Sequence, residues 1–346
     1  MRSNIQEKLK LGIVGFGRLG AVHAKNIANS EIAELYAVCD SSQEARERAE
    51  ISYGAKTFAC LEDFLSLPLE GVIVATTTSE HLAAITATAN AGIPVFTEKP
   101  VGLTLEETDI ALQQVVNAGV QFQIGFQRRW DPRYIEAKKV IESGEIGEAV
   151  LIKSYGRDPN ASNPANWGLD KNGGLFLNAA IHDYDAARFF FQDEATAITA
   201  SGAALVYKDL TKLQDIDTCA TTLFFHDDKM AITEWSRYAA YGYDIGTEII
   251  CTEGAIRIGS IEQSRMIVKY KNSYAPTLFD VFADAFQGQI EGFIQSVKEG
   301  KTASPGIEDA RIALQLALLA RESFTAKSER LVVSALSPLK KQPLTD

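Results

Sequence analysis

Three polar residues in one short segment carry the side chains that proton transfer and hydroxyl binding require. Asn178 and His182 are four residues apart, and Asp185 follows three residues later. On a helix this spacing places the three side chains near one face. An imidazole titrates near neutral pH, so His182 is suited to accept a proton from a bound hydroxyl group. The competing interpretation is a buried polar cluster capped by a histidine, and the segment alone leaves both open.

A glycine pair, Gly173 and Gly174, comes just before these residues. Glycine permits backbone conformations and close approaches that other residues do not. The pair therefore predicts that the backbone here closely approaches another group, such as a flat ring or another chain.

A second chemical signal lies near the N-terminus, where an apolar strand runs into Gly15-x-Gly17-x-x-Gly20 and a helical pattern follows. Strand, glycine loop and helix in this order predict a dinucleotide-binding turn. Gly15 permits the turn, Gly17 lets backbone amides approach a pyrophosphate, and Gly20 lets helix and strand pack closely. The helix N-terminus adds positive potential, and Arg18 either reaches the same phosphates or stays a solvated surface residue. The alternative is a glycine-rich turn that binds no nucleotide.

Asp40 ends the next strand, twenty residues after Gly20. A carboxylate at this place accepts hydrogen bonds from the adenosine ribose and repels a 2′-phosphate. Ser41 and Ser42 supply no arginine to offset that repulsion. The sequence therefore predicts NAD, rather than NADP, as the cofactor.

The composition limits the classes of partner. The chain has 346 residues, of which 46% are hydrophobic, so two domains with their own cores are expected. The net charge of −11 argues against non-specific nucleic-acid binding. The four cysteines have neither metal-ligand nor disulfide spacing, and no apolar run is long enough to span a membrane. We expect a cytoplasmic protein without a metal, membrane or nucleic-acid partner.

Strands and helices alternate through the first third of the chain, which predicts an α/β fold with a doubly wound parallel Rossmann sheet. Ligands bind at the carboxyl ends of such strands, where Thr76, Glu98 and Lys99 lie. From about residue 147, polar turns separate short strands and predict a mostly antiparallel sheet, followed by helices at 279–299 and 307–327. We expect domains at 1–126 and 127–346. The strands expected in the second domain are 149–155, 195–205, 218–225, 229–237, 247–252, 255–259 and 264–270.

Lys99 lies in Glu98-Lys99-Pro100, at the end of a strand where a nicotinamide is expected. A lysine there can hydrogen-bond a substrate oxygen and stabilise negative charge as a hydroxyl group is oxidised. Pro100 fixes the turn that carries the lysine. The alternative is an ordinary surface lysine before a helix.

Four motifs together resemble the glucose–fructose oxidoreductase/inositol dehydrogenase/rhizopine-catabolism (Gfo/Idh/MocA) family, and the match spans nearly the whole chain. The motifs are Gly15–Gly20 with His23-Ala24, Glu98-Lys99-Pro100, Gly125–Asp131 and Gly173–Asp185. Segments 154–159 and 182–188 most resemble the inositol 2-dehydrogenase branch. The resemblance implies a Rossmann domain, then an open antiparallel sheet that commonly mediates dimers or tetramers. It also implies hydride transfer from a sugar or polyol carbinol to the nicotinamide.

The resemblance also implies roles for single residues. Lys99 would orient the reacting hydroxyl group, His182 would take its proton, and Asp185 would contact substrate hydroxyls. Position 178 is most often aspartate in the inositol dehydrogenases, and Asn178 cannot balance the charge of Lys99 or raise the pKa of His182. We therefore expect both bases to deprotonate more easily than they would beside an aspartate.

The expected catalytic residues are Lys99, His182 and Asn178. The cofactor-binding residues are expected to be Gly15, Gly17, Arg18, Leu19, Gly20, Asp40, Thr76, His81, Glu98 and Lys99. The substrate-binding residues are expected to be Lys99, Arg128, Asp158, Asn178, His182, Asp185 and Tyr241. Arg128, Asp158 and Tyr241 have the alternative of being ordinary interface or surface residues.

The sequence thus predicts NAD-dependent oxidation of a cyclic polyol hydroxyl to a ketone, of the myo-inositol 2-dehydrogenase type. One alternative is a dehydrogenase of another sugar or polyol. A third hypothesis is a non-catalytic NAD-binding regulator that kept the fold, and Asn178 leaves it open.

Overall fold

The structure is a computed structural model that describes residues 7–159, 168–259 and 277–342. The chain groups into two compact units. Unit 1 takes in described residues up to Gln127, then Phe286–Arg311 and the chain from Ser337, whereas unit 2 takes in those of Arg128–Ala285 and Ile312–Leu336. The predicted boundary at 126/127 is one residue from the first change of unit, and it leaves out the later returns to unit 1. As a division into sequence domains it stays a prediction.

Unit 1 contains the expected parallel sheet. Its strand order is β3-β2-β1-β4-β5-β6, and every neighbouring pair is parallel. The order moves outward from β1 in both directions, which confirms the doubly wound topology. The strands are β1 (Leu9–Val14), β2 (Ala33–Cys39), β3 (Lys56–Phe58), β4 (Gly71–Val74), β5 (Val95–Thr97) and β6 (Phe122–Ile124). The helices between them are α1 (Arg18–Ala28), α2 (Gln43–Tyr53), α3 (Leu61–Leu65), α4 (Thr78–Asn90) and α5 (Leu105–Ala118).

The core of unit 1 explains why a late segment of the chain belongs to it. Ile13, Ile73 and Phe96 from the sheet are fully buried in one apolar cluster with Ile290 and Phe293. The last two residues lie on α10 (Ala283–Glu299). Removing these side chains from water stabilises the packing of α10 on the parallel sheet.

Unit 2 contains a seven-stranded sheet in the order β12-β11-β7-β10-β9-β8-β13. β10 pairs with β7 in parallel, and the other pairs are antiparallel, so the prediction of a mostly antiparallel sheet is confirmed. The strands are β7 (Ala149–Arg157), β8 (Ala197–Ala203), β9 (Thr218–Phe224), β10 (Met230–Ser236), β11 (Asp244–Cys251), β12 (Ala255–Gly259) and β13 (Leu331–Val332). The predicted strand at 264–270 lies outside the described residues.

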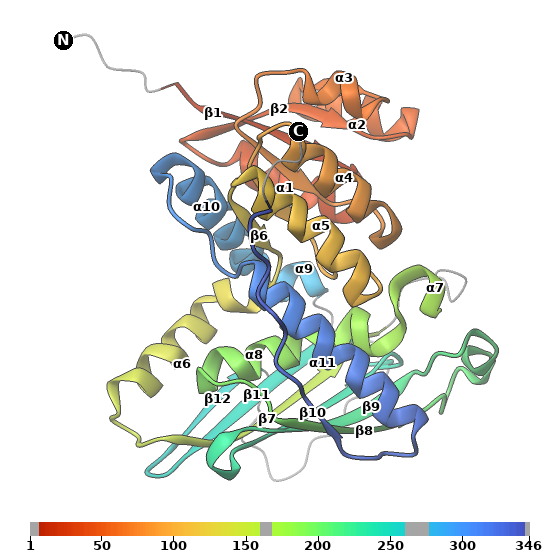
Figure 1. The fold of residues 1–346 in the computed structure, drawn as a ribbon, viewed down its shortest axis with the longest axis vertical. Coiled ribbons are helices and arrows are strands. Elements are labelled where there is room, and N and C mark those ends of the chain that lie inside the picture. The colour runs from red at the N-terminus through yellow and green to blue at the C-terminus, as the bar shows by residue number, and fades with distance from the viewer. Residues whose placement is uncertain (1–6, 160–167, 260–276, 343–346) are drawn as a thin grey trace. The chain divides into compact units, whose positions relative to one another are not determined.

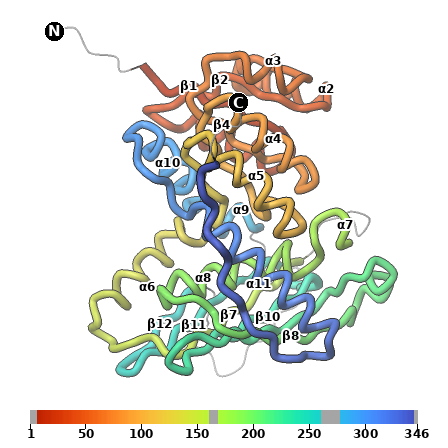
Figure 2. The backbone as a smooth tube through the Cα atoms, viewed as in Figure 1, coloured from red at the N-terminus to blue at the C-terminus, as the bar shows by residue number. Residues whose placement is uncertain are grey.

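The two faces of this sheet differ. Figure 1 shows α6 (Pro132–Ser143) and α8 (Ile181–Phe191) on one face, and α8 contacts both β7 and β10. Figure 2 shows the same two helices along that face in the backbone trace. On β10, Met230 and Ile232 are exposed while Ala231 and Thr233 are buried. This alternation means that the face opposite α8 carries exposed apolar side chains.

The late helices differ slightly from the prediction. In place of one helix over 279–299, the chain forms α9 (Leu278–Val281) and α10, with Phe282 between them in a non-helical conformation. The last helix, α11, spans Ile307–Thr325 and ends two residues earlier than predicted. Helix ends are set by capping and packing, which apolar periodicity does not report.

Candidate active site

The glycine loop joins β1 to α1 in unit 1. Gly15 has a φ of +91°, a conformation that favours glycine, and its amide donates to Cys39 O at 2.8 Å. A Cβ on Gly20 would lie 2.0 Å from Gly15 O, so only glycine lets the first turn of α1 pack on the loop. A Cβ on Gly17 would meet no heavy atom within 4 Å. The loop therefore leaves open space beside its backbone, at the N-terminus of α1, as a bound pyrophosphate requires.

Asp40 lies beside this loop and is bonded to it. Its carboxylate accepts hydrogen bonds from Phe16 N at 2.6 Å and from Ser42 N at 2.8 Å. Arg46 on α2 donates to the backbone oxygens of Asp40 and Ser41 at 2.8 and 3.0 Å. This arginine is not next to Asp40 in the sequence, where Ser41 and Ser42 follow, but six residues further on. The missed signal is that side chains on a helix point back towards its N-terminus, so Arg46 reaches Asp40.

The turn that carries Lys99 lies at the carboxyl end of β5. Two histidines contact the residues on either side of Lys99. Glu98 Oε1 is 2.7 Å from His23 Nε2, and both side chains are buried. His81 Nδ1 donates to Pro100 O at 2.8 Å, and its Nε2 is 3.3 Å from Thr76 O. Burial lowers the pKa of His81, which keeps its ring neutral at pH 7. The side chains of Glu98 and His81, expected near the cofactor, are thus engaged by neighbours within unit 1.

The glycine pair in unit 2 makes a close approach to its own chain. Gly173 and Gly174 have φ values of +76° and +75°. Leu175 N donates to Asp215 Oδ1 at 2.9 Å, and a Cβ on Gly174 would lie 2.8 Å from the same oxygen. Asp215 in turn accepts a 2.8 Å hydrogen bond from Arg237. The expected close approach of the backbone is present, and the group approached at Gly174 is a buried carboxylate of unit 2.

Asn178 does not lie on an α-helix. It belongs to a π-helical segment, Phe176–Ala180, and His182 lies on α8, which follows directly. Both side chains are partly exposed. The wider π turn changes the i, i+4 alignment that an α-helix would give, and single π turns are frequent at functional sites.

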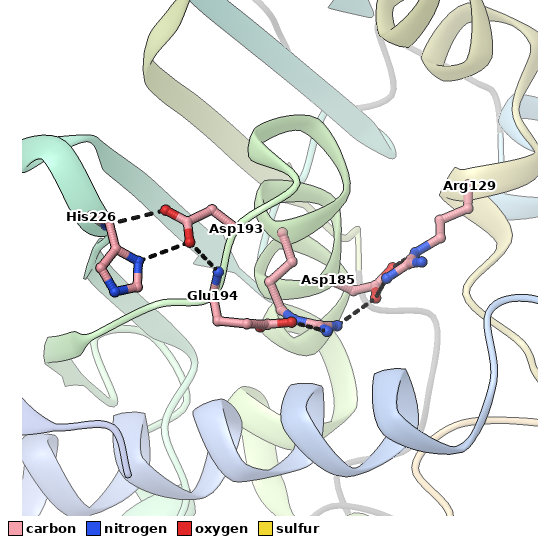
Figure 3. Close-up of polar contacts among 6 residues, drawn as sticks. Arg129, Asp185, Asp193, Glu194 and His226 are labelled. Carbon is pink, nitrogen blue, oxygen red and sulfur yellow. Dashed lines mark hydrogen bonds and ion pairs between the residues drawn. The ribbon is translucent and has the colours of Figure 1, made fainter. Parts of the chain in front are cut away.

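Asp185 is held by arginines, as Figure 3 shows for Arg129. Arg129 Nε and Nη2 donate to the two carboxylate oxygens at 2.9 and 2.6 Å. Arg188 Nη1 lies 3.5 Å from Asp185 Oδ1, and its own Nε donates to Glu194 at 2.6 Å. Arg129 was not among the expected site residues, although it lies in the motif Gly125–Asp131. A bidentate arginine and a buried aspartate form the stronger kind of ion pair.

Arg128, which was expected in the substrate pocket, has a buried side chain that forms an ion pair. Its side chain is 2% exposed, and it donates to Asp183 Oδ1 at 2.6 Å and to Oδ2 at 3.3 Å. Trp235 Nε1 donates to the same carboxylate. A buried charge must be paired, and Arg128 and Asp183 pair with each other, so the substrate contact expected of Arg128 stays a prediction.

Tyr241 lines a hollow of about 560 Å³ at the ends of β7 to β10. Its hydroxyl donates to Asp244 Oδ2 at 3.3 Å, and burial raises its pKa to about 12. Trp235 and Arg157 also line this hollow. Asp158 follows β7, and its backbone amide donates to Ser236 O at 2.9 Å.

The candidate residues fall into two groups. Gly15, Gly17, Gly20, Asp40, Thr76, His81, Glu98 and Lys99 belong to unit 1, and Asp158, Asn178, His182, Asp185 and Tyr241 belong to unit 2. Within the described ranges, no group of three His, Cys, Asp or Glu side chains is placed to hold a metal ion. None of the helices in those ranges is long and apolar enough to cross a membrane.

Comparison with known proteins finds a family match for sequence in each of the two units. Residues 9–126 match the oxidoreductase family with an NAD-binding Rossmann fold, and residues 134–257 match the GFO/IDH/MocA C-terminal domain. The chain is 34% identical over 330 residues to a scyllo-inositol 2-dehydrogenase (NAD(+)) of Bacillus subtilis, covering 92% of this chain and 95% of that one. It is 32% identical to an inositol 2-dehydrogenase of Rhizobium meliloti, covering 93% and 98% of the two chains.

A solved structure of an inositol dehydrogenase has a similar fold. Scyllo-inositol dehydrogenase from Lactobacillus casei, with bound NAD(H) and scyllo-inositol, matches with a TM-score of 0.85 and 31% identity over 94% of this chain and 99% of that one. The chain therefore belongs to the GFO/IDH/MocA oxidoreductase family, and residues 9–126 are its NAD-binding Rossmann domain.

Proposed function

We propose that this protein oxidises one hydroxyl group of an inositol to a ketone, with NAD as the oxidant, as a myo-inositol 2-dehydrogenase does. The observation that carries the proposal is similarity over more than nine-tenths of the chain to inositol dehydrogenases. The relative solved with NAD(H) and scyllo-inositol shares the fold over the same extent. The open space beside Gly17 and the carboxylate of Asp40 fit a dinucleotide.

The proposed cofactor contacts come from the loop and the strand ends of unit 1. The loop backbone at Gly17, where the space is open, is proposed to approach the pyrophosphate together with Arg18 and Leu19, while Gly15 and Gly20 shape the loop. Asp40 accepts hydrogen bonds from the ribose, and Thr76 lies at the carboxyl end of β4. A dinucleotide held by these residues would supply the acceptor for the hydride that leaves the carbinol carbon.

The residues of this chain manage the proton and the developing charge. Lys99 donates a hydrogen bond to the reacting oxygen and stabilises its negative charge as the O–H bond breaks. His182 accepts that proton, and the C–O single bond becomes a carbonyl. Asn178, Asp185, Asp158 and Tyr241 are proposed to contact the remaining hydroxyl groups and orient the ring.

Nicotinamide absorbance tests the proposal directly. Purified protein is mixed with NAD or NADP and a panel of inositols, aldoses and acyclic polyols. We expect NAD reduction with an inositol, and a loss of several orders of magnitude in turnover for Lys99→Ala with nearly unchanged NAD affinity. Faster NAD reduction with an aldose than with an inositol would favour the alternative of a sugar dehydrogenase. The observation that supports this alternative is Asn178, which stands where the inositol dehydrogenases usually have an aspartate. NAD binding without turnover on any member of the panel would favour the non-catalytic regulator.

We also propose that the protein is a homo-oligomer, a dimer or tetramer, formed through the exposed face of the sheet in unit 2. Met230 and Ile232 are 36% and 39% exposed there, and Val150 on β7 is 37% exposed. A second copy would remove these apolar side chains from water. Light scattering after size exclusion measures the mass, and Ile232→Lys should shift the protein towards the monomer. A wild-type protein that is monomeric at micromolar concentration would contradict this assembly.

The cytoplasm is the proposed compartment. Cys39, Cys60, Cys219 and Cys251 are all free thiols, and Cys60 is exposed. Free exposed thiols persist in a reducing compartment.

A further inference from the structure

The turn that carries Lys99 is fixed on both sides by buried side chains that the proposed reaction does not use. We propose that Glu98, His23 and His81 are positioning residues that hold this turn, and that they act on the reaction through Lys99. The inference rests on the proposed role of Lys99. It differs from the sequence expectation that Glu98 and His81 contact the cofactor.

The first fixed point is the pair formed by Glu98 and His23. The carboxylate and the imidazole are 6% and 0% exposed, and Oε1 lies 2.7 Å from Nε2. A carboxylate can only accept here, so Nε2 donates. Among the described residues Nδ1 has no hydrogen-bond partner, so Glu98 alone sets the polar contact of this ring. Breaking a buried pair of this kind leaves one polar group without compensation.

The orientation of His23 is also limited by packing. Its ring makes edge-to-face contacts with Phe96 and Phe286, at centroid distances of 5.4 and 6.2 Å. His23 lies on α1, two turns at most from the glycine loop. The pair therefore ties the turn after β5 to the helix whose N-terminus the dinucleotide requires.

Gly125 lies next to the same carboxylate and leaves room for it, because it has no side chain. A Cβ at this position would lie 3.0 Å from Glu98 Oε2 and 3.1 Å from Cδ and Oε1. The amide of Gly125 donates to Thr97 O at 2.8 Å, which fixes the backbone beside Glu98. A glycine at position 125 thus leaves the space that the Glu98 carboxylate occupies.

The second fixed point is the carbonyl of Pro100. His81, 1% exposed, donates to it from Nδ1 at 2.8 Å. The other ring nitrogen lies 3.3 Å from Thr76 O, at the end of β4. Glu98 is thus fixed by its side chain and by its amide, which donates to Val74 O at 3.0 Å. Pro100 is fixed by its carbonyl, so the residues on both sides of Lys99 are held. The base of the Lys99 side chain then starts from a defined place.

The experiment separates positioning from cofactor binding and from stability. Glu98→Gln keeps the shape of the side chain and removes its charge. We expect kcat to fall about 10- to 100-fold, because small displacements of a reacting group cost that much. The Kd of NAD should stay within about threefold, and hydrogen exchange in cofactor-free protein should accelerate at the amides of Glu98 and Lys99.

Two further variants test the geometry. His23→Gln retains a donor for the carboxylate and should keep more of kcat than His23→Leu, which retains none. In a Lys99→Ala background, Glu98→Gln should cause no further loss, because its effect passes through Lys99. The matched control is His226→Leu, which removes the donor from an exposed histidine–carboxylate pair with Asp193 of similar length, 2.8 Å, and should change none of these quantities.

Some results would overturn the inference. One is an unchanged kcat per folded molecule in Glu98→Gln. Another is that Glu98→Gln lowers kcat as much in the Lys99→Ala background as it does in the wild-type protein. The third is a weakening of NAD binding that accounts for the whole loss of activity. If the wild-type protein turns over no polyol, the proposed function fails. Unchanged hydrogen exchange in Glu98→Gln would then overturn the positioning role independently, and faster exchange at Glu98 and Lys99 would support it.

Discussion

Two glycines of the same loop should respond differently to alanine, because only one of the two substitutions should lower the stability of the cofactor-free protein. At Gly20 the new Cβ would lie 2.0 Å from Gly15 O and 3.0 Å from Gly15 C. Unstrained carbon–oxygen contacts are about 3.3 Å or longer, so α1 and the loop must separate by more than about 1 Å. Overpacking of this kind costs about 1–3 kcal/mol. Gly20→Ala should therefore lower the free energy of unfolding and also weaken NAD binding, because the loop moves.

Gly17→Ala should leave the cofactor-free protein intact. No heavy atom lies within 4 Å of the new Cβ, and Gly17 has a φ of −74°, which alanine adopts without strain. Stability should change by less than about 0.5 kcal/mol. The methyl group occupies the open space beside the backbone, so the loss of one charge-assisted hydrogen bond, about 1.5–3 kcal/mol, is expected. The Kd of NAD should rise about 10- to 150-fold.

Urea unfolding without NAD and calorimetric titration with NAD measure the two quantities separately. The reasoning is refuted if Gly17→Ala destabilises the cofactor-free protein as much as Gly20→Ala does. It is equally refuted if Gly17→Ala binds NAD as tightly as the wild type.

Four further outcomes are expected. Asp40→Ser should shift the ratio of NADP to NAD activity by at least about tenfold, since Arg46 remains beside the position; an unchanged ratio would contradict the role of the carboxylate. Asn178→Asp should move the pH profile of kcat to higher pH, because an added anion raises the pKa of nearby bases; a superimposable profile would exclude it. Arg128→Met should destabilise the fold by about 3–5 kcal/mol in urea, because Asp183 stays buried without its counter-charge; a loss below about 1 kcal/mol would contradict that. His81 has a lowered pKa in the folded protein, so the unfolded chain binds the proton first and stability should fall below about pH 6.5; His81→Gln should flatten this dependence, and unfolding curves against pH would detect its persistence.

Much of unit 1 was predictable because its signals are local in the chain. The strand–glycine loop–helix order, Asp40 after the next strand and the apolar runs of β1 and β4 involve residues that are close in sequence. Backbone conformation and period-2 or period-3.6 burial depend on such neighbours, so they leave a pattern that can be read directly. Lys99 was found in the same way, at the end of β5. The motif that contains Lys99 also resembles the family, and that resemblance implied the fold class that the two sheets confirm.

Two neighbouring arginines show what local sequence patterns cannot predict, namely which partner each side chain binds. Arg128 and Arg129 have identical chemistry in adjacent positions, and one pairs with Asp183 while the other pairs with Asp185. No spacing rule separates them, because the choice depends on a segment more than fifty residues away. Arg128 was the arginine expected in the substrate pocket, and its side chain is 2% exposed beside Asp183.

By itself the sequence determined the parallel sheet, the mostly antiparallel sheet, the dinucleotide loop and the candidate residues Lys99 and His182. Only the tertiary structure decided which partners these groups have. His23 meets Glu98 across 75 residues, Gly174 packs against Asp215, and α10 returns to the parallel sheet. The physical reason is that burial and ion pairing are set by residues that come together in space, and long-range contacts of this kind leave no period in one sequence.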